Sequence, residues 1–546
     1  MILDLSSKKT LVVEDQAIMR ETIKHILGSF GIRHIVEVES GVSAITAMRI
    51  EKFDIVLCDY NLLKEKNGQQ VLEEARYLKL LPLNSIFIMV TGEQNQDMVL
   101  TALDNKPDDY LIKPFNWQQL LNRIQRCYSR KTYLSSIEHE IDSGNLYQAI
   151  DNCEKLLQTN DKKMRMPLLK MYAELTIKVG DFKTAETIYQ NILQEREIPW
   201  ARLGLGITAF FLGYYDQAID TFHGLINQYP MMLEVYDWLV KAHEAQGNDE
   251  HAISSLNSAV TLSPMSILRQ KKLAFLADKT ENLPVAKKAY TATIKLGKYS
   301  IHRSPADYSG LANVYLKSNA SNEALKLVYE LNQQFHNNPE AQLRAALLEV
   351  NIHQAKGNKG LAQQAYSKTF KLNEKFGKQV SKSLRLDMAK TFYLNGNAEV
   401  CEQIIRDLIQ TNIDDKPFIK DLVTLCNTLI DENYANNLIQ QAQKELVDIN
   451  NKGVILFQEG DIKGALAVFE QAIKKMPDNH TIILNMIKIS IHDIKSSKPN
   501  AEKVTHVQSY INKAIEVGIP HEQISGLQTE LNTISLQKQP ITRQNV

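Results

Sequence analysis

Short apolar runs alternate with amphipathic stretches over about the first 130 residues of the chain. The apolar runs are rich in β-branched side chains and cover residues 10–13, 34–38, 54–58, 85–90 and 109–112. The stretches with helical periodicity include Ala17–Leu27, Gly41–Arg49, Gln69–Lys79 and Trp117–Cys127. This alternation predicts an α/β domain with a doubly wound parallel sheet. Such sheets bind ligands at the carboxyl ends of their strands, so the residues at those ends are the first candidates for chemistry.

A second, purely helical pattern follows from about residue 130. Turn positions recur in it and separate helical stretches, at Gly144, Gly180, Gly213, Gly247, Glu281, Asn319, Gly357, Gly396 and Gly460. They lie 33 to 39 residues apart as far as Gly396, and the last interval is 64, so one more copy is expected around Asp431–Asn433. Because glycine tolerates the left-handed conformation that ends a helix, the pattern predicts a row of helical hairpins.

A small residue and a large one follow the turns at fixed distances. In most copies an alanine, such as Ala185 or Ala218, lies five residues beyond the turn, and a large side chain, such as Tyr189 or Phe222, lies nine beyond it. Positions four apart share one face of a helix, where the small residue admits the paired helix and the large one fills the gap to the next hairpin. Since one hairpin cannot bury a core alone, a stacked solenoid is expected.

These features resemble the tetratricopeptide repeat (TPR) family, including the small residues Gly206 and Gly453 seven positions before the turn. The resemblance covers residues 132–520 and implies an all-α superhelix of about nine to eleven hairpins. Residues 521–546 are expected to form a C-terminal cap and a disordered tail. No proline or glycine lies between Pro114 and Gly144, so a continuous helix should join the α/β domain stiffly to the first repeat.

The composition weighs against several classes of protein. Lys+Arg and Asp+Glu both number 63 and no terminal helix-turn-helix is evident, so no direct DNA binding is expected. The longest apolar runs have the length of a strand, and no membrane insertion is expected. The five cysteines are scattered without CxxC spacing, which favours a reducing, cytoplasmic location over a disulfide framework or a zinc site.

Polar side chains stand at the ends of the predicted strands. Glu14 and Asp15 end the first, Asp59 follows the third, Thr91 the fourth, and Lys113 the fifth. Carboxylates that meet at one edge repel each other, and a divalent cation that prefers oxygen ligands relieves the repulsion. A nearby lysine adds positive charge for an incoming phosphoryl group. These residues predict a phosphoryl-transfer site that uses a divalent cation.

This ordered set resembles the response-regulator receiver family over residues 8–130. The resemblance implies that Asp59 is the phosphoacceptor and is loaded by a sensor histidine kinase or a phosphotransfer protein. It also implies four ligands for Mg²⁺, namely Glu14, Asp15, Asp59 and the backbone carbonyl of Asn61. Lys113, before a cis bond to Pro114, would pair with a phosphoryl oxygen. Thr91 and Tyr110 would form the switch toward the surface around helix 4, strand 5 and helix 5.

The segment after Asp59 departs from the family pattern. The family usually has a proline soon after the phosphoacceptor, whereas this chain reads DYNLLKEKNG. The path from Asp59 to Gly68 is also about one residue longer than usual. The loop that flanks the site is therefore expected to be more mobile, which would affect the choice of phosphoryl donor.

The expected output is protein binding through the concave face of the solenoid. Residues whose position in the repeat directs them to this groove are Lys170, Glu174, Trp200, Ile207, Phe210, Phe211, Asp237, Lys241, Asn313 and Asn351. Ordinary packing between repeats is an equally good interpretation of these residues.

The leading hypothesis is a non-enzymatic response regulator whose phosphorylation controls the binding of an unknown protein ligand. One alternative is a phosphate sink, in which the repeats only recruit the protein to a kinase. Another is a transcription-linked regulator that acts through a DNA-binding partner. An enzymatic output ranks last, because no second set of clustered catalytic residues follows the first domain.

Overall fold

The N-terminal α/β domain is built on a parallel sheet. The computed structural model describes residues 5–62, 65–92, 107–159, 161–413, 415–431, 433–496 and 501–536. In this part of the chain five strands form one sheet in the order β2-β1-β3-β4-β5: β1 (Lys9–Val13), β2 (His34–Val38), β3 (Ile55–Asp59), β4 (Ile86–Thr91) and β5 (Asp109–Ile112). All pairings are parallel. Each predicted strand is confirmed to within one residue at either end, and so is the doubly wound fold.

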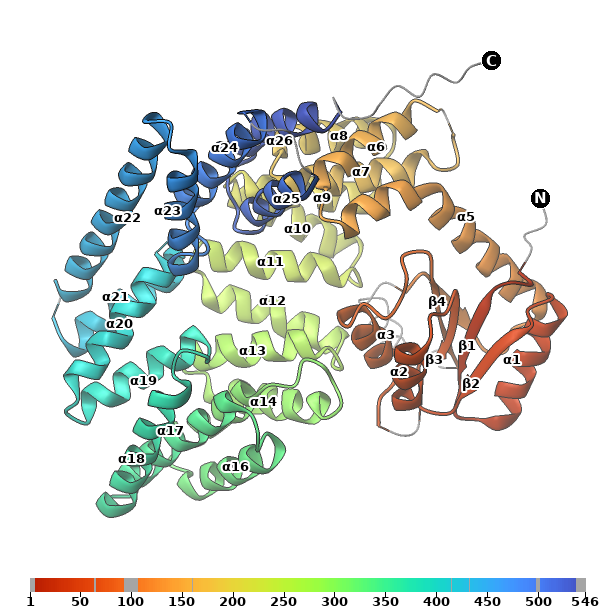
Figure 1. Cartoon of the computed structure of the whole chain (residues 1–546). Coiled ribbons are helices and arrows are strands. Elements are labelled where there is room, and N and C mark those ends of the chain that lie inside the picture. Colours follow the sequence, from red (N-terminus) through yellow and green to blue (C-terminus); the bar gives the residue numbers. More distant parts are fainter. Residues whose placement is uncertain are drawn as a thin grey trace.

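Helices cover both faces of this sheet (Figure 1). The helices α1 (Ala17–Ser29) and α5 (Trp117–Asp142) pack on one face, and α2 (Gly41–Ile50) and α3 (Gly68–Tyr77) pack on the other. Every residue of β3 and β4 is therefore buried, which explains their continuous apolar runs. The strand order reverses between β1 and β3, and this reversal opens a crevice at the carboxyl ends of those two strands.

One long helix joins the two parts of the protein. The 26-residue helix α5 runs without a break, as the lack of proline and glycine predicts. Its first half carries Leu120 and Ile124 into the core of the sheet domain, and its second half carries Leu134 and Ile137 into the core of the first hairpin. Because one rigid element contributes to both cores, the two parts are coupled without a flexible tether.

All described elements after α5 are helices, and they stack as hairpins along a curved path (Figure 1). Their bounds are α6 (Leu146–Leu157), α7 (Arg165–Val179), α8 (Phe182–Glu195), α9 (Pro199–Phe211), α10 (Tyr215–Gln228), α11 (Leu233–Ala245), α12 (Asp249–Leu262), α13 (Ile267–Lys279), α14 (Leu283–Gly297), α15 (Pro305–Lys317), α16 (Ser321–Gln334), α17 (Pro339–Ala355), α18 (Lys359–Phe376), α19 (Lys382–Leu394), α20 (Ala398–Asn412), α21 (Lys416–Leu429), α22 (Tyr434–Gln458), α23 (Ile462–Lys475), α24 (His480–Ser496), α25 (Ala501–Glu516) and α26 (His521–Leu536).

The turn positions take the backbone conformation that the repeat pattern predicts. Every glycine named as a turn has a positive φ, between 73° and 86°. Glu281 and Asn319 adopt φ values of 59° and 57°, so the two weaker copies reverse the chain in the same way without glycine. The additional copy is also present, because a break between α21 and α22 lies at the expected place. The helix α22 then continues for 25 residues, with no turn before the next copy.

The two ends of the solenoid meet. The Tyr147 hydroxyl on α6 lies 2.9 Å from Nδ1 of His521 at the start of α26, and the two rings stack. A Cβ on Gly144 would lie 2.5 Å from the Asn512 side chain of α25. Figure 1 shows the C-terminal helices against the first hairpins. Much of the expected C-terminal cap is thus the packed helix α26, and residues 537–546 of the expected tail lie outside the described residues.

No helix in the described part of the chain is both long and apolar enough to cross a membrane.

Candidate phosphoacceptor site

The crevice between β1 and β3 gathers the polar side chains that the sequence places at strand ends. Glu14 and Asp15 follow β1, Asp59 is the last residue of β3, and Lys113 follows β5. Because the strands are parallel, these residues lie at one edge of the sheet. The bond between Lys113 and Pro114 is cis, as the resemblance implied.

Lys113 contacts two of the three carboxylates. Its Nζ lies 2.6 Å from Oε2 of Glu14 and 3.0 Å from Oδ2 of Asp59. One carboxylate oxygen from each of Glu14, Asp15 and Asp59 lies within 4.8 Å of the other two. Glu14 is fully buried and Asp59 is 5% exposed, so the lysine offsets a concentration of negative charge that water reaches poorly.

The pKa values reflect this competition between burial and charge. Burial raises the pKa of the Glu14 carboxyl and of the Asp59 carboxyl, and the contact with Lys113 opposes the rise. Burial by itself would lower the pKa of Lys113, but its bonds to the two carboxylates outweigh that effect and raise its pKa. Additional positive charge at this place would stabilise the ionised carboxylates further.

The donor set fits a small divalent cation. One carboxylate oxygen of Asp15, Oδ1, is buried and accepts no hydrogen bond. Asp15 lies beside the other two acids, and with Asp59, Asn61 and Lys113 it lines a cavity of about 250 Å³. Only oxygen ligands are offered, which suits Mg²⁺ better than a softer metal. Mg²⁺ held by these residues would neutralise negative charge and orient the phosphoryl oxygens.

The two expected switch residues lie on the neighbouring strands. Thr91 ends β4, is 5% exposed, and its carbonyl accepts a hydrogen bond from the backbone nitrogen of Lys113. The Tyr110 ring on β5 packs against the core between the sheet and the helices α2 and α3. Residues 93–106, which include the segment expected to form helix 4, lie outside the described residues.

Comparison with known proteins agrees with this geometry. The family model of the response regulator receiver domain matches residues 10–125, and that of the tetratricopeptide repeat matches residues 200–230. The chemotaxis protein CheY of Pseudomonas aeruginosa is 30% identical over 125 residues, which cover 22% of this chain and 97% of that protein. The chain belongs to the response-regulator receiver family. It carries a receiver domain followed by a TPR-like helical region.

Other relatives match a similar share of the chain. A CheY homolog of Campylobacter jejuni is 34% identical over 118 residues, which cover 21% of this chain and 89% of that protein. The solved structure of a CheY-like receiver domain from Methylobacillus flagellatus is 30% identical, with a TM-score of 0.20, and it covers 22% of this chain and 98% of that one.

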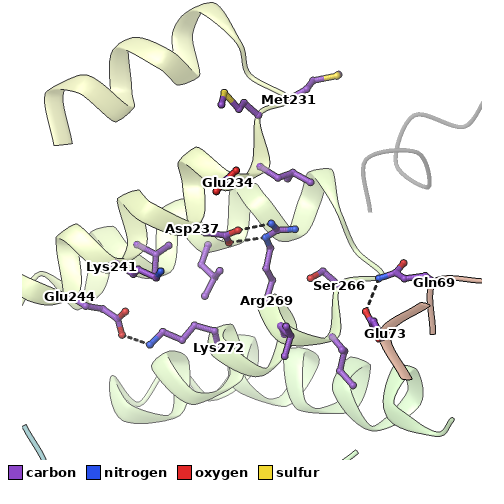
Figure 2. Close-up of a pocket in the computed structure, with 16 residues that line it drawn as sticks. Gln69, Glu73, Met231, Glu234, Asp237, Lys241, Glu244, Ser266, Arg269 and Lys272 are labelled. Carbon is purple, nitrogen blue, oxygen red and sulfur yellow. Dashed lines mark hydrogen bonds and ion pairs between the residues drawn. The ribbon is translucent and has the colours of Figure 1, made fainter. Parts of the chain in front are cut away.

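The candidate groove residues of the TPR region fall into separate places. Asp237 and Lys241 line a cavity of about 720 Å³ between α11 and α13 (Figure 2). Asn313 and Asn351 line another cavity, of about 290 Å³. The remaining candidates, Lys170, Glu174, Trp200, Ile207, Phe210 and Phe211, line neither of these two cavities.

Aromatic packing explains the positions of several candidate groove residues that line neither cavity. Phe210 and Phe211 pack against each other and against Trp238. Trp200 packs against Tyr189, and Nζ of Lys170 lies 5.6 Å from the centre of the Trp200 ring. The alternative of inter-repeat packing therefore describes Phe210 well, whereas Phe211 keeps 44% of its surface exposed.

Several residues of the larger cavity were missed by the sequence reasoning. Arg269 and Lys272 of α13 face α11 and form ion pairs with Asp237 and Glu244 (Figure 2). For Arg269 the sequence held a signal, because it is a positive charge about one repeat beyond the candidate Asp237, whereas Glu244, the partner of Lys272, was not a candidate. Gln69 and Glu73 come from the receiver helix α3 and complete the wall, and no pattern in the repeats points to them.

Proposed function

We propose that this protein is a two-component response regulator that accepts a phosphoryl group on Asp59 and thereby controls the binding of another protein by its TPR region. The observation that carries the proposal is the placement of Lys113, 3.0 Å from Asp59 and 2.6 Å from Glu14, beside an Asp15 oxygen that has no hydrogen-bond partner. A site that already balances buried negative charge with one cation is suited to a second cation and a phosphoryl group.

In the proposed reaction Asp59 is the nucleophile. One of its carboxylate oxygens forms a bond to phosphorus while the bond from phosphorus to a histidine nitrogen of the donor breaks, and that nitrogen takes up a proton. Lys113 would move from the carboxylates to a phosphoryl oxygen. Glu14, Asp15, Asp59 and the Asn61 carbonyl are the residues that would hold Mg²⁺. The donor would be a sensor histidine kinase or a phosphotransfer protein, and we expect the protein to act in the cytoplasm.

The proposed output surface is the groove around α11 and α13. Arg269 and Lys272 are each paired with a carboxylate there, whereas Lys241 makes no ion pair among the described residues and instead lies 3.7 Å from the centre of the Trp238 ring. Burial lowers the pKa of Lys241, so an acidic group would stabilise its charged form. The cavity also exposes Met231 and Leu268. A protein segment with an apolar side chain beside a carboxylate would complement both features.

The phosphoacceptor is tested by incubation with Mg²⁺ and acetyl phosphate. The wild-type protein should become labelled, and Asp59→Asn should not. Asp54→Asn is the matched control, because Asp54 precedes the same strand at the opposite edge of the sheet, where it pairs with Lys8. This control should be labelled like the wild type. Equal labelling of Asp59→Asn would show that the acceptor lies elsewhere.

The adaptor output is separated from the alternatives by comparing the proteins bound by the phosphorylated form and by Asp59→Asn. The proposal expects phosphorylation to change the occupancy of at least one bound protein. Identical bound proteins and occupancies would favour the phosphate sink. Retention of a DNA-binding protein by one form would favour the transcription-linked alternative.

A further inference from the structure

The receiver touches the solenoid through the segment that follows the phosphoacceptor. Nζ of Lys66 donates a hydrogen bond of 2.7 Å to the carbonyl of Tyr299, and Nε2 of Gln70 donates one of 3.2 Å to the carbonyl of Leu296. Both carbonyls lie at the C-terminal end of α14 or directly after it. Figure 1 shows the receiver beside this part of the solenoid. Lys66 and Gln70 are called the latch below.

The latch is tied to the backbone of the phosphoacceptor. The nitrogen of Gly68 donates to the carbonyl of Tyr60, and a Cβ on Gly68 would collide with the carbonyl oxygen of Asp59. Glycine is therefore required where α3 begins, because the helix end rests directly on Asp59. Any shift of the backbone between Asp59 and Asn61 must be transmitted to the start of α3.

Gln70 is part of both the helix end and the contact with the solenoid. Its Oε1 accepts from the nitrogen of Asn67, and the Asn67 side chain accepts from the nitrogen of Gln70, which completes a capping box at the start of α3. Its Nε2 is the group that reaches Leu296. The same side chain thus fixes the helix end and the docking contact.

The next residues of α3 form a wall of the groove cavity. Gln69 and Glu73 line the cavity of about 720 Å³ together with α11 and α13, and Figure 2 shows Gln69 beside Ser266. Gln69 donates to Glu73 through Nε2, and its Oε1 accepts from the hydroxyl of Tyr60. A chain of direct contacts therefore leads from the residue after Asp59 to the lining of the groove.

We infer that receiver helix α3 is a movable wall of this cavity, held against α14 by the latch and loosened when Asp59 is phosphorylated. The phosphorylation step rests on the proposed function. A cation held by the Asn61 carbonyl would draw on the backbone at the base of α3, and hydrogen bonds weaken steeply when their donors are displaced. Because the latch residues hold α14 through hydrogen bonds of 2.7 and 3.2 Å, a small displacement would weaken this contact.

The inference is tested by hydrogen exchange and mass spectrometry on the full-length protein, with and without Mg²⁺ and acetyl phosphate. In the wild type, peptides that cover residues 293–303 should exchange faster after phosphorylation by about three- to tenfold, because the end of α14 opens more easily once the latch no longer holds its carbonyls. Asp59→Asn should show no change.

A double variant, Lys66→Met with Gln70→Glu, should exchange fast at residues 293–303 in both states and still become labelled. Glutamate keeps the acceptor of the capping box and removes the donor to Leu296. Lys52→Ala is the control, because Lys52 donates to two carbonyls inside the receiver and not to the solenoid. It should leave residues 293–303 unchanged.

Two results would overturn the inference: a double variant that exchanges like the wild type, or a labelled wild type whose residues 293–303 exchange at the same rate or more slowly. Absence of labelling would instead contradict the proposed function. In that case the double variant would still decide whether the latch exists.

Discussion

At the carboxyl edge of the sheet, Glu14, Asp15 and Asp59 differ in whether a positive charge contacts their carboxylate. Lys113 contacts Glu14 and Asp59, whereas Asp15 has a buried oxygen that accepts no hydrogen bond. A buried acceptor without a partner costs free energy, so this oxygen is the part of the site with most to gain from a cation. Asp15 is therefore the residue whose change should affect Mg²⁺ binding most directly.

Asp15→Asn should weaken Mg²⁺ binding by at least about tenfold, which corresponds to about 1.4 kcal/mol. The amide removes the negative charge and keeps nearly the same shape. Isothermal titration calorimetry with MgCl₂ measures the change, and Asp54→Asn again serves as the control. Equal affinity of Asp15→Asn and the wild type would mean that Asp15 is not a ligand.

At the level of the helical hairpin, the repeat pattern has a direct physical meaning. A Cβ on Gly206, seven residues before its turn, would lie 2.6 Å from a ring carbon of Phe222, nine residues after the same turn. Gly453 meets Phe469 in the same way at the turn Gly460, six turns of the sequence pattern later along the chain. The small and the large residue are thus one contact, repeated between the two helices of a hairpin.

Gly206→Ala should destabilise the protein by about 1–3 kcal/mol, because the added methyl overpacks the contact with Phe222. Gly224→Ala is the matched control, since Gly224 is also helical but a Cβ there meets nothing within 4 Å. The control should be neutral or more stable by up to about 1 kcal/mol, the gain in helix propensity. Urea unfolding followed by circular dichroism measures the free energy of unfolding of both variants. Equal changes in Gly206→Ala and Gly224→Ala would contradict the contact between Gly206 and Phe222.

Across the whole molecule, the end of the solenoid supports its beginning. Ile511 of α25 is fully buried in a core against which Tyr147 of α6 packs. The first hairpin also shares α5 with the receiver. The C-terminal helices therefore stabilise the hairpin that positions the receiver beside the groove.

Ile511→Ala should destabilise the C-terminal helices by about 2–5 kcal/mol and speed hydrogen exchange in α6. Exchange in α16 should stay as in the wild type, since stability in solenoids depends on neighbouring units. Ile455→Ala, at a position 51% exposed on α22, is the control. It should change neither the stability of the C-terminal helices nor the exchange rate in α6. An unchanged α6 in Ile511→Ala would argue against closure.

Local patterns sufficed for much of the fold and of the site. The alternation of strand and helix, the turn at Asn319 without glycine and the continuous α5 were all predictable, because each depends on residues close in sequence. The acids and Lys113 were predictable as a group for a different reason. Parallel strands bring their carboxyl ends to one edge whatever the details of packing.

The groove was predictable only in part. Asp237 and Lys241 were expected from their place in the repeat, but their partners on α13 were not, because side-chain pairing depends on how far successive hairpins rotate. Phe210 illustrates the same difficulty, since a repeat position alone cannot separate a groove residue from one that packs against Trp238.

The sequence by itself determined an α/β part followed by a helical part, their elements and the residues of a candidate phosphoacceptor site, because those features follow from periodicity and from the ends of parallel strands. Only the tertiary structure decided that the solenoid closes on itself and that α3 of the receiver lies against α14. These contacts join residues as far as 374 and 226 positions apart. They depend on small rotations between successive hairpins that accumulate along the solenoid. No local sequence pattern determines the accumulated rotation.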